Sequence, residues 1–251
     1  MPLAGHNTYS LEENVCCVRY YDMKGITMEN IRLVDIREFI LSDNQNDAEK
    51  IRDLLAEKKI FLINLMSSPG SGKTSLIIQT VRQLKSKFKF GIIEGDIEST
   101  VDAEKVASEG VQAVQITTGG MCHLDASMIS IGLEKLDLST LDIVIIENIG
   151  NLVCPAEFDL GENLKVMILS VPEGDDKILK YPMMFSVCDV LIINKADYLP
   201  DDGFDMEFLI KKVKNLNPNI EIMMTSCRTG AGIEAWAEWL ASRVVEYKSK
   251  R

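Results

Sequence analysis

The chain has 251 residues, which is enough for one large domain or for one domain with an appendage. Apolar residues make up 46% and can form a core, whereas a net charge of −11 argues against nucleic acid as a partner. No apolar run approaches the roughly 18 residues of a membrane helix. Residues 1–10 lack the pattern of a secretory signal, so we expect a cytoplasmic protein with no membrane partner.

Residues 1–58 are predicted to form an N-terminal extension, which has a polar start followed by two amphipathic helical patterns at about 29–41 and 46–58. The intervening run Ser42-Asp43-Asn44-Gln45-Asn46 is typical of a loop that caps the second helix. The sequence leaves open whether this extension packs on the following domain or docks a partner.

Residues 59–251 are predicted to form one α/β domain, because short apolar runs alternate with helical patterns. The continuous apolar character of most runs favours a largely parallel sheet that helices cover on both faces. We therefore expect three layers around a sheet of about seven strands. The expected strands are 60–66, 89–94, 112–116, 142–147, 165–170, 189–194 and 221–225.

A phosphate-binding loop is predicted directly after the first strand, in the run Ser67-Ser68-Pro69-Gly70-Ser71-Gly72-Lys73-Thr74. Backbone N–H groups of such a loop and of the following helix start face the phosphates of a nucleoside triphosphate. Lys73 would reach the β- and γ-phosphates, and the Thr74 hydroxyl would bind Mg²⁺. The alternative is a glycine-rich turn, because Ser67 stands where the usual pattern has glycine. The expected nucleotide-binding residues here are Gly70, Ser71, Gly72, Lys73, Thr74 and Ser75.

Two further strand ends carry groups that suit triphosphate chemistry. Glu147-Asn148-Ile149-Gly150 is a variant of the DxxG switch, in which the acid orients magnesium-bound water and the Gly150 N–H senses the γ-phosphate. Asp96, at the end of the second strand, is another candidate for the magnesium shell. The predicted catalytic residues are therefore Lys73, Thr74, Asp96 and Glu147. No arginine finger or catalytic glutamine is identifiable, which favours slow hydrolysis.

Asn194-Lys195-Ala196-Asp197 predicts that the nucleotide is GTP. The Asp197 carboxylate can accept hydrogen bonds from guanine N1–H and from the exocyclic amine, whereas adenine lacks both donors. Asn194 and the stem of Lys195 would brace the loop and cover the base. After the last strand, Thr225-Ser226-Cys227-Arg228-Thr229-Gly230 resembles an SAK-type loop that contacts the guanine carbonyl, with Ser226 and Cys227 as binding residues.

A transition-metal site is a second possibility, because Cys122-His123 and Cys154 supply two thiolates and an imidazole, donors favoured by nickel and zinc. Cys154 lies four residues beyond Gly150. Three donors are completed most easily if two copies of the chain face each other. The residues alone leave two interpretations open, because free cysteines most often fill small spaces in a core.

Several linked motifs together identify a family. They are Ser67–Thr74, Glu94-Gly95-Asp96, Thr118–Asp125, Glu147–Pro155, Glu173-Gly174-Asp175-Asp176 and Asn194–Asp197. Over about residues 30–245 the chain resembles the HypB family, the hydrogenase nickel-incorporation GTPases. The resemblance implies a P-loop GTPase of the SIMIBI class that uses GTP and Mg²⁺, hydrolyses GTP slowly and forms a homodimer on GTP binding. It implies a site for Ni²⁺ or Zn²⁺ at Cys122, His123 and Cys154.

The resemblance also implies partners, namely a HypA-type nickel/zinc protein and, indirectly, the large subunit of nickel–iron hydrogenase. The chain departs from many family members because it has neither an N-terminal CxxCxC motif nor a histidine-rich tract. It contains only two histidines in all. Cys16-Cys17 is the one possible substitute, and adjacent cysteines in an extended segment point to opposite faces.

Three alternatives remain. A urease accessory GTPase would carry a Cys-Pro-His motif, which this sequence lacks. A second alternative is a nickel- or zinc-binding scaffold that uses nucleotide to set its oligomeric state without significant turnover. A third is a GTPase that serves another nickel enzyme, such as urease or carbon monoxide dehydrogenase.

Overall fold

The computed structural model of the chain describes residues 36–96, 101–199 and 203–250. The expectations for residues 1–35, including Cys16-Cys17, lie outside these residues. The described residues belong to one compact unit that begins at Ile36. The first helix of this unit ends at Lys58, and it belongs to the same compact unit as the residues from 59 onward.

Seven parallel strands form one sheet in the order β3-β2-β4-β1-β5-β6-β7. The predicted three-layer α/β fold is confirmed, and each predicted strand is present with ends that shift by at most two residues. The strands are β1 Phe61–Ser67, β2 Phe90–Asp96, β3 Gln112–Thr117, β4 Ile143–Glu147, β5 Leu164–Ser170, β6 Val190–Asn194 and β7 Glu221–Met224.

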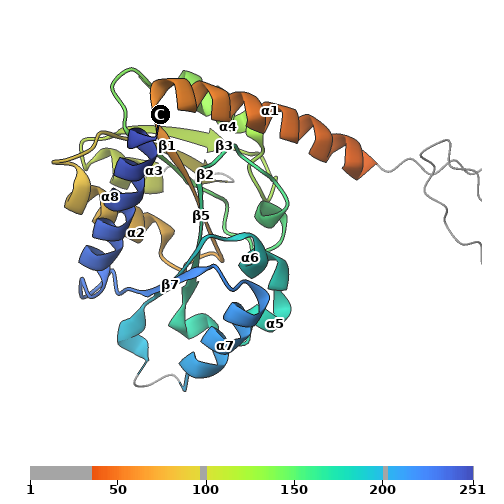
Figure 1. Cartoon of the computed structure of the whole chain (residues 1–251), viewed down its shortest axis with the longest axis vertical. Coiled ribbons are helices and arrows are strands. Elements are labelled where there is room, and N and C mark those ends of the chain that lie inside the picture. The colour runs from red at the N-terminus through yellow and green to blue at the C-terminus, as the bar shows by residue number, and fades with distance from the viewer. Residues whose placement is uncertain (1–35, 97–100, 200–202, 251) are drawn as a thin grey trace, which may run out of the picture. The chain divides into compact units, whose positions relative to one another are not determined.

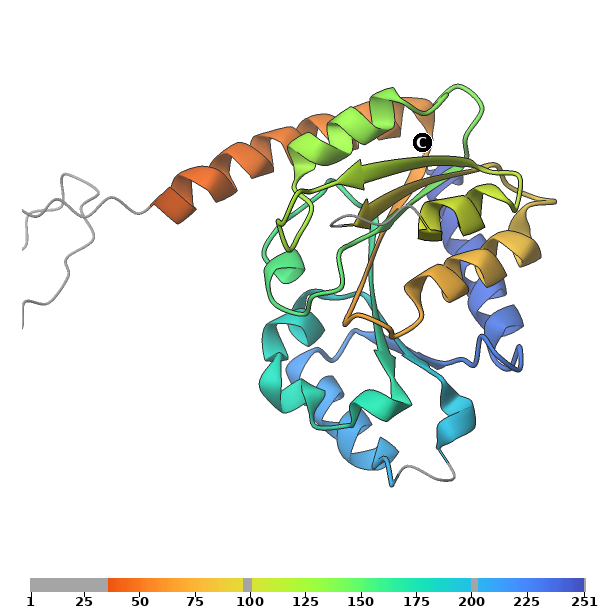
Figure 2. The same ribbon diagram turned by 180° about the vertical axis from the view of Figure 1, so that it is seen from behind.

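Helices cover both faces of this sheet (Figures 1 and 2). Successive side chains of a strand point to opposite faces. One set packs against α2 (Lys73–Leu84), α3 (Val101–Ala107) and α8 (Ile233–Ser249). The other set packs against α1 (Ile36–Lys58) and α4 (Ala126–Glu134), and towards β6 against α6 (Pro182–Val187) and α7 (Met206–Leu216). Short helical segments complete the chain: α5 (Lys177–Lys180), η1 (Cys154–Ala156), η2 (Val171–Glu173) and η3 (Ala196–Tyr198).

The predicted loop at 42–46 is wrong, because α1 runs without interruption from Ile36 to Lys58. Its inner face buries Ala48, Ile51 and Leu55 in the core beside α4. Ser, Asp and Asn favour caps because their side chains compete for backbone hydrogen bonds. Here Asn44 is buried and its side chain bonds to other segments instead. Tertiary contacts therefore override the local preference.

The last helix, α8, buries apolar residues that recur at helical spacing. Trp236 and Leu240 of α8 are buried against the sheet, and the Trp236 indole N–H donates to the Thr80 hydroxyl of α2 at 2.9 Å. Trp236 is therefore a core residue. None of the helices in the described part of the chain has the length and hydropathy needed to span a membrane.

Candidate nucleotide and metal site

The loop between β1 and α2 is held against the end of β6. Gly72 has φ of +104°, and a Cβ there would lie 2.4 Å from Asn194 Nδ2, so only glycine fits. The Asn194 amide donates to the Ser71 carbonyl at 2.9 Å, and Lys195 Nζ donates to the Gly70 carbonyl at 2.8 Å. The two predicted nucleotide motifs therefore contact each other, although they lie about 120 residues apart.

Lys73 begins α2 and points back under the loop. Its Nζ donates to Ser67 Oγ at 3.2 Å, so the serine that stands in the usual glycine position contacts the ammonium group. Burial lowers the pKa of Lys73, while the carboxylates of Glu147 and Glu94 act in the opposite direction. The lysine and both acids line one cavity of about 280 Å³ beside the loop.

Buried carboxyl groups in this cavity suit a divalent cation. Glu147 accepts a hydrogen bond from the Thr74 hydroxyl at 2.9 Å, which brings together two of the predicted magnesium ligands. Burial, together with the neighbouring Glu147 carboxylate, raises the pKa of Glu94 to about 10, and burial also raises the pKa of Glu147. Within the described part of the chain, one oxygen of each is buried without a hydrogen-bond partner. Asp96 lines the same cavity.

The switch segment contacts the phosphate loop directly. A Cβ on Gly150 would lie 2.9 Å from three atoms of Pro69, so the segment after β4 can approach the loop this closely only with glycine. Asn148 and Gly150 both line the phosphate-side cavity. A conformational change in the loop would therefore act on the segment after β4 by direct contact.

The predicted base-binding residues surround a second cavity, of about 250 Å³, which Asp197, Lys195 and Cys227 line together with Gly72 and Ser75 of the phosphate loop. The Ser226 hydroxyl donates to Asp197 Oδ1, and Arg228 pairs with Asp197 Oδ2 at 2.7 Å. The hydrogen bond from Ser226, with the Arg228 charge, lowers the pKa of Asp197. Burial raises the pKa of the Cys227 thiol to about 11, which disfavours the reactive thiolate form.

Cys122, His123 and Cys154 come together in one cluster. Their donor atoms lie within 4.8 Å of one another, the two Sγ atoms 3.2 Å apart and Cys122 Sγ 3.9 Å from His123 Nδ1. The Asn151 amide donates to the Cys122 carbonyl at 3.1 Å, which ties the two segments together. The ring of Phe158 stacks on the imidazole with centroids 4.0 Å apart, and burial lowers the pKa of His123.

This donor set fits a nickel or zinc ion. Two ligands that each lie about 2.0–2.3 Å from one ion are about 3–4 Å apart at ordinary coordination angles, close to the separations here. Soft thiolates and an imidazole are donors that these ions favour. Among the residues the structure describes, the cluster has no fourth His, Cys, Asp or Glu. A partner molecule or a solvent ligand would fill the remaining position.

Comparison with known proteins settles the family. The model "CobW/HypB/UreG, nucleotide-binding domain" matches residues 61–224. The hydrogenase maturation factor HypB of Rhizobium leguminosarum is 45% identical over 213 residues, covering 85% of this chain and 71% of that protein. The chain belongs to the HypB family. The hydrogenase/urease maturation factor HypB of Helicobacter hepaticus is 43% identical and matches 78% of this chain and 82% of its own length.

A solved HypB structure has the same fold. The crystal structure of Helicobacter pylori HypB in complex with nickel is similar with a TM-score of 0.78 and 38% identity, covering 81% of this chain and 96% of that one. The nickel belongs to the H. pylori protein.

Two acids of this HypB-family chain were missed as site residues in the sequence. Glu94 lies two residues before Asp96, and its place in the cavity follows only from the alignment of β2 with β4, where Glu94 pairs with Glu147. Glu173 accepts hydrogen bonds from Ser71 Oγ at 2.6 Å and from Ser170 Oγ at 2.7 Å. Burial disfavours its charge, but the bonds from serines outweigh burial and hold the pKa of Glu173 below its usual range. The sequence signal that could identify Glu173 as a site residue is its position just after β5, at the carboxyl end of a strand.

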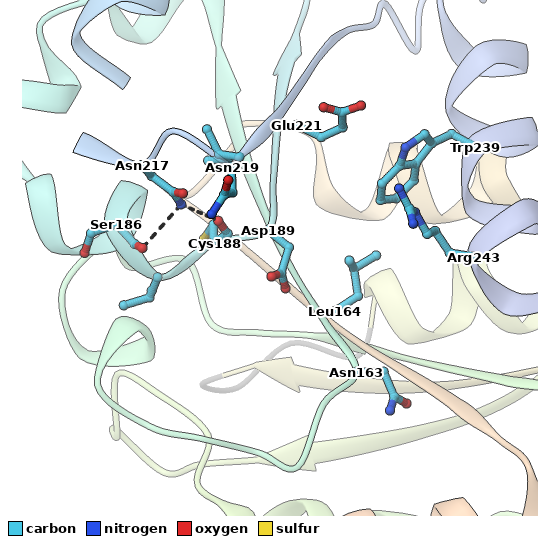
Figure 3. A pocket seen from close by; sticks show the side chains of 12 residues that line it. Asn163, Leu164, Ser186, Cys188, Asp189, Asn217, Asn219, Glu221, Trp239 and Arg243 are labelled. Atoms are coloured by element: carbon cyan, nitrogen blue, oxygen red, sulfur yellow. Dashed lines mark hydrogen bonds between the residues drawn. The ribbon is translucent and has the colours of Figure 1, made fainter. Parts of the chain in front are cut away.

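A larger cavity lies at the opposite edge of the sheet, where β5 and β7 of this HypB-family fold begin (Figure 3). It measures about 520 Å³, and Asp189, Asn217 and Trp239 are among its lining residues. The Asn217 amide donates to the carbonyls of Ser186 and Cys188. Asp189 accepts a hydrogen bond from the Lys165 backbone. These polar groups serve the fold, and parallel sheets place ligands at the other edge.

Proposed function

We propose that this chain is a GTP-hydrolysing nickel metallochaperone for the maturation of nickel–iron hydrogenase. One observation carries the proposal: the cysteine-bearing end of the switch segment reaches the metal cluster. Cys154 lies four residues beyond Gly150, and its sulfur is 3.2 Å from Cys122 Sγ. A segment that contacts the phosphate loop at one end and holds a metal ligand at the other can couple hydrolysis to metal transfer.

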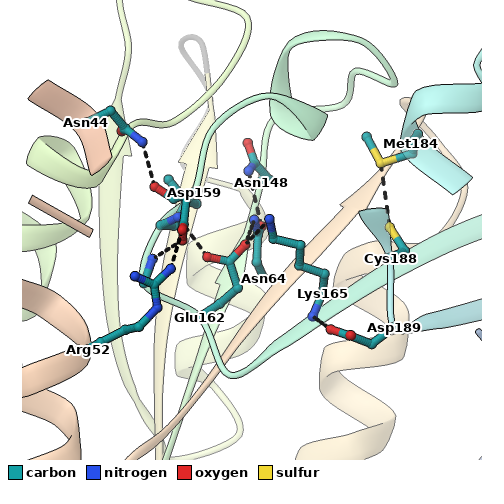
Figure 4. A network of polar contacts seen from close by, with 12 residues as sticks. Asn44, Arg52, Asn64, Asn148, Asp159, Glu162, Lys165, Met184, Cys188 and Asp189 are labelled. Carbon is teal, nitrogen blue, oxygen red and sulfur yellow. Dashed lines mark hydrogen bonds and ion pairs between the residues drawn. The ribbon is translucent and has the colours of Figure 1, made fainter. Parts of the chain in front are cut away.

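A second contact links the two sites through buried side chains. Asn148 of the switch accepts a hydrogen bond from the Leu124 backbone, adjacent to His123, at 3.4 Å. Its amide donates to Asn64 of β1 at 3.1 Å, and Asn64 donates to the buried Glu162 at 3.2 Å (Figure 4). Such a network has few alternative arrangements. A shift of Asn148 would therefore displace the loop that carries Cys122 and His123.

The chemical roles follow from position. Lys73 and the backbone N–H groups of its loop stabilise negative charge on the transferring phosphoryl group. The hydroxyl of Thr74 and the carboxylates of Glu147 and Asp96 would hold Mg²⁺, which supplies charge neutralisation between the β- and γ-phosphates. Glu94 lies beside Glu147 and joins this acidic set. We propose slow hydrolysis, because the sequence has no identifiable arginine finger or catalytic glutamine.

Asp197 selects the base. We expect Asp197→Asn to lower GTP affinity by about a hundredfold or more, because an amide places a donor opposite the exocyclic amine of guanine. Xanthine carries a carbonyl at that position, so xanthosine triphosphate should bind the variant better than GTP does. Competition binding with the two nucleotides measures the preference. Asp47→Asn, a change at a partly exposed position on α1, is the matched control. An unchanged GTP preference in the Asp197 variant would contradict the assignment.

We further propose a GTP-dependent homodimer in which two copies of the cluster complete one metal site. Three donors per chain leave a coordination position open, and the closed symmetry of a two-fold dimer brings identical donors face to face. We also propose a HypA-type nickel/zinc protein and, indirectly, the hydrogenase large subunit as partners, a proposal that membership of the HypB family supports.

The test combines turnover with mass. Phosphate release is measured with and without nickel, and the mass and metal content of the protein are measured with a non-hydrolysable GTP analogue. We expect slow turnover and one metal per dimer. Binding of GTP and dimerisation with no phosphate release would identify a scaffold instead, and one metal per monomer would contradict the shared site.

A further inference from the structure

Asn44 is a buried polar residue on α1, 7% exposed, at the place where the sequence predicts a loop. Both ends of its side chain are used. Its Oδ1 accepts from the Ala126 backbone N–H at 2.8 Å, and its Nδ2 donates to the Asp159 carbonyl at 2.7 Å (Figure 4). One side chain therefore joins two segments that lie more than 30 residues apart in the sequence.

Both of these segments carry metal-binding residues. Ala126 begins α4 and lies three residues after His123. Asp159 lies five residues after Cys154 and directly follows Phe158, whose ring stacks on the His123 imidazole. Arg52, two turns further along α1, forms an ion pair with the Asp159 carboxylate. Helix α1 thus holds the segment that supports the imidazole from two points.

We propose that Asn44 is a positioning residue for the metal site, which fixes the His123-bearing and Cys154-bearing segments relative to each other. The inference rests on the metal centre of the proposed function and adds that α1, as well as the GTPase motifs, contributes to its affinity. Without the two hydrogen bonds, the segment at 158–159 is free to shift against α4, and Phe158 loses its position over the imidazole. Donors that are not held in place bind a metal ion less tightly.

The experiment measures the affinity of the full chain for Ni²⁺ and for Zn²⁺ by competition with a chromogenic chelator. We expect Asn44→Ala to weaken both affinities about tenfold, the lower end of the loss seen when residues behind a metal ligand are changed. The absorption of the nickel–thiolate complex should change shape, because the angles between donors change. Gln45→Ala, an exposed neighbour on the same helix, should change neither quantity.

Two further variants distinguish a specific loss of metal affinity from a general loss of stability. Leu240→Ala removes a buried side chain of α8, in a core cluster that contains no residue of either segment, and should lower the melting temperature without weakening metal binding. Arg52→Ala removes only the ion pair with the Asp159 carboxylate, from a side chain that is partly exposed. It should therefore fold even if Asn44→Ala does not, and it should also weaken metal binding. Nickel affinity that falls only in step with melting temperature would overturn the inference.

A double-mutant cycle tests whether Asn44 acts on His123 through Phe158. Phe158→Leu keeps an apolar side chain but removes the stacked ring, and its effect on nickel affinity should not add to that of Asn44→Ala, because both act on His123. Fully additive effects would overturn the route through Phe158. If the parent protein binds neither metal, the proposed function itself fails. If the parent binds and Asn44→Ala binds equally, only this inference fails.

Discussion

Lys73→Ala should reduce GTP hydrolysis by about a thousandfold while the nucleotide-free protein stays folded. The buried ammonium group is the cation of the phosphate-side cavity that reaches the loop, and a single such donor to the transition state is worth about 10²–10³ in rate. The fold should persist, because burial raises the pKa of both Glu94 and Glu147, so removal of the ammonium group need not leave two buried charges without a cation. Phosphate release under single-turnover conditions measures the first effect, and the melting temperature measures the second.

A matched lysine is available just beyond the same helix. Lys85 is exposed and pairs with Glu109, so Lys85→Ala should leave the hydrolysis rate unchanged. Hydrolysis at the parental rate in Lys73→Ala would mean that the loop does not bind a triphosphate in the proposed way. Loss of folding in Lys73→Ala would instead mean that the main role of Lys73 is to neutralise the buried carboxyl groups of Glu94 and Glu147.

Cys154→Ser should weaken Ni²⁺ binding by more than about a hundredfold. Losing one of three donors costs more than the 10–100-fold that follows when a residue behind a ligand is lost. The same change should remove the dependence of nickel affinity on bound nucleotide, because Cys154 is the donor carried by the switch. By reciprocity, nickel should then no longer alter GTP affinity either. Nickel titrations with GDP and with a non-hydrolysable GTP analogue measure both effects.

Cys188→Ala is the control for this experiment. Cys188 is buried at the end of α6, and its thiol donates a hydrogen bond to the sulfur of Met184. The change should therefore lower stability and leave nickel affinity intact. Equal nickel affinity in Cys154→Ser and the parent would contradict the metal assignment. Retained affinity in Cys154→Ser with loss in Cys122→Ser would place the site on the Cys122–His123 loop alone.

Much of the fold could be predicted because its strands are buried on both faces. Continuous apolar runs such as Ile143–Ile146 show no alternation of apolar and polar residues, which indicates a strand covered on both faces. A polar residue follows such a run at the carboxyl end of the strand, where parallel sheets place their ligands. The α1 helix could not be predicted correctly, because Asn44 is a cap-forming residue by local preference. Its conformation depends on Ala126 and Asp159, distant in sequence.

The candidate site divides in the same way. The phosphate loop and Asp197 are recognisable from spacing, because their chemistry needs fixed residue types over a short stretch. Glu94 and Glu173 are not, because each acts through a neighbouring strand end: Glu94 beside Glu147, and Glu173 on the Ser71 hydroxyl. Strand order, which sequence pattern leaves open, decides those neighbours.

The sequence by itself determined that this chain has a parallel α/β fold, a loop for a triphosphate, an acid suited to guanine and three donors suited to nickel or zinc. Those properties reside in residue type and short spacing. The tertiary structure alone decided that Cys122, His123 and Cys154 meet, that Gly150 touches Pro69, and that Asn44 joins the segments that follow His123 and Cys154. The reason is physical: each of these contacts joins residues separated by 30 or more positions, and only the packing of helices on the sheet brings them within reach.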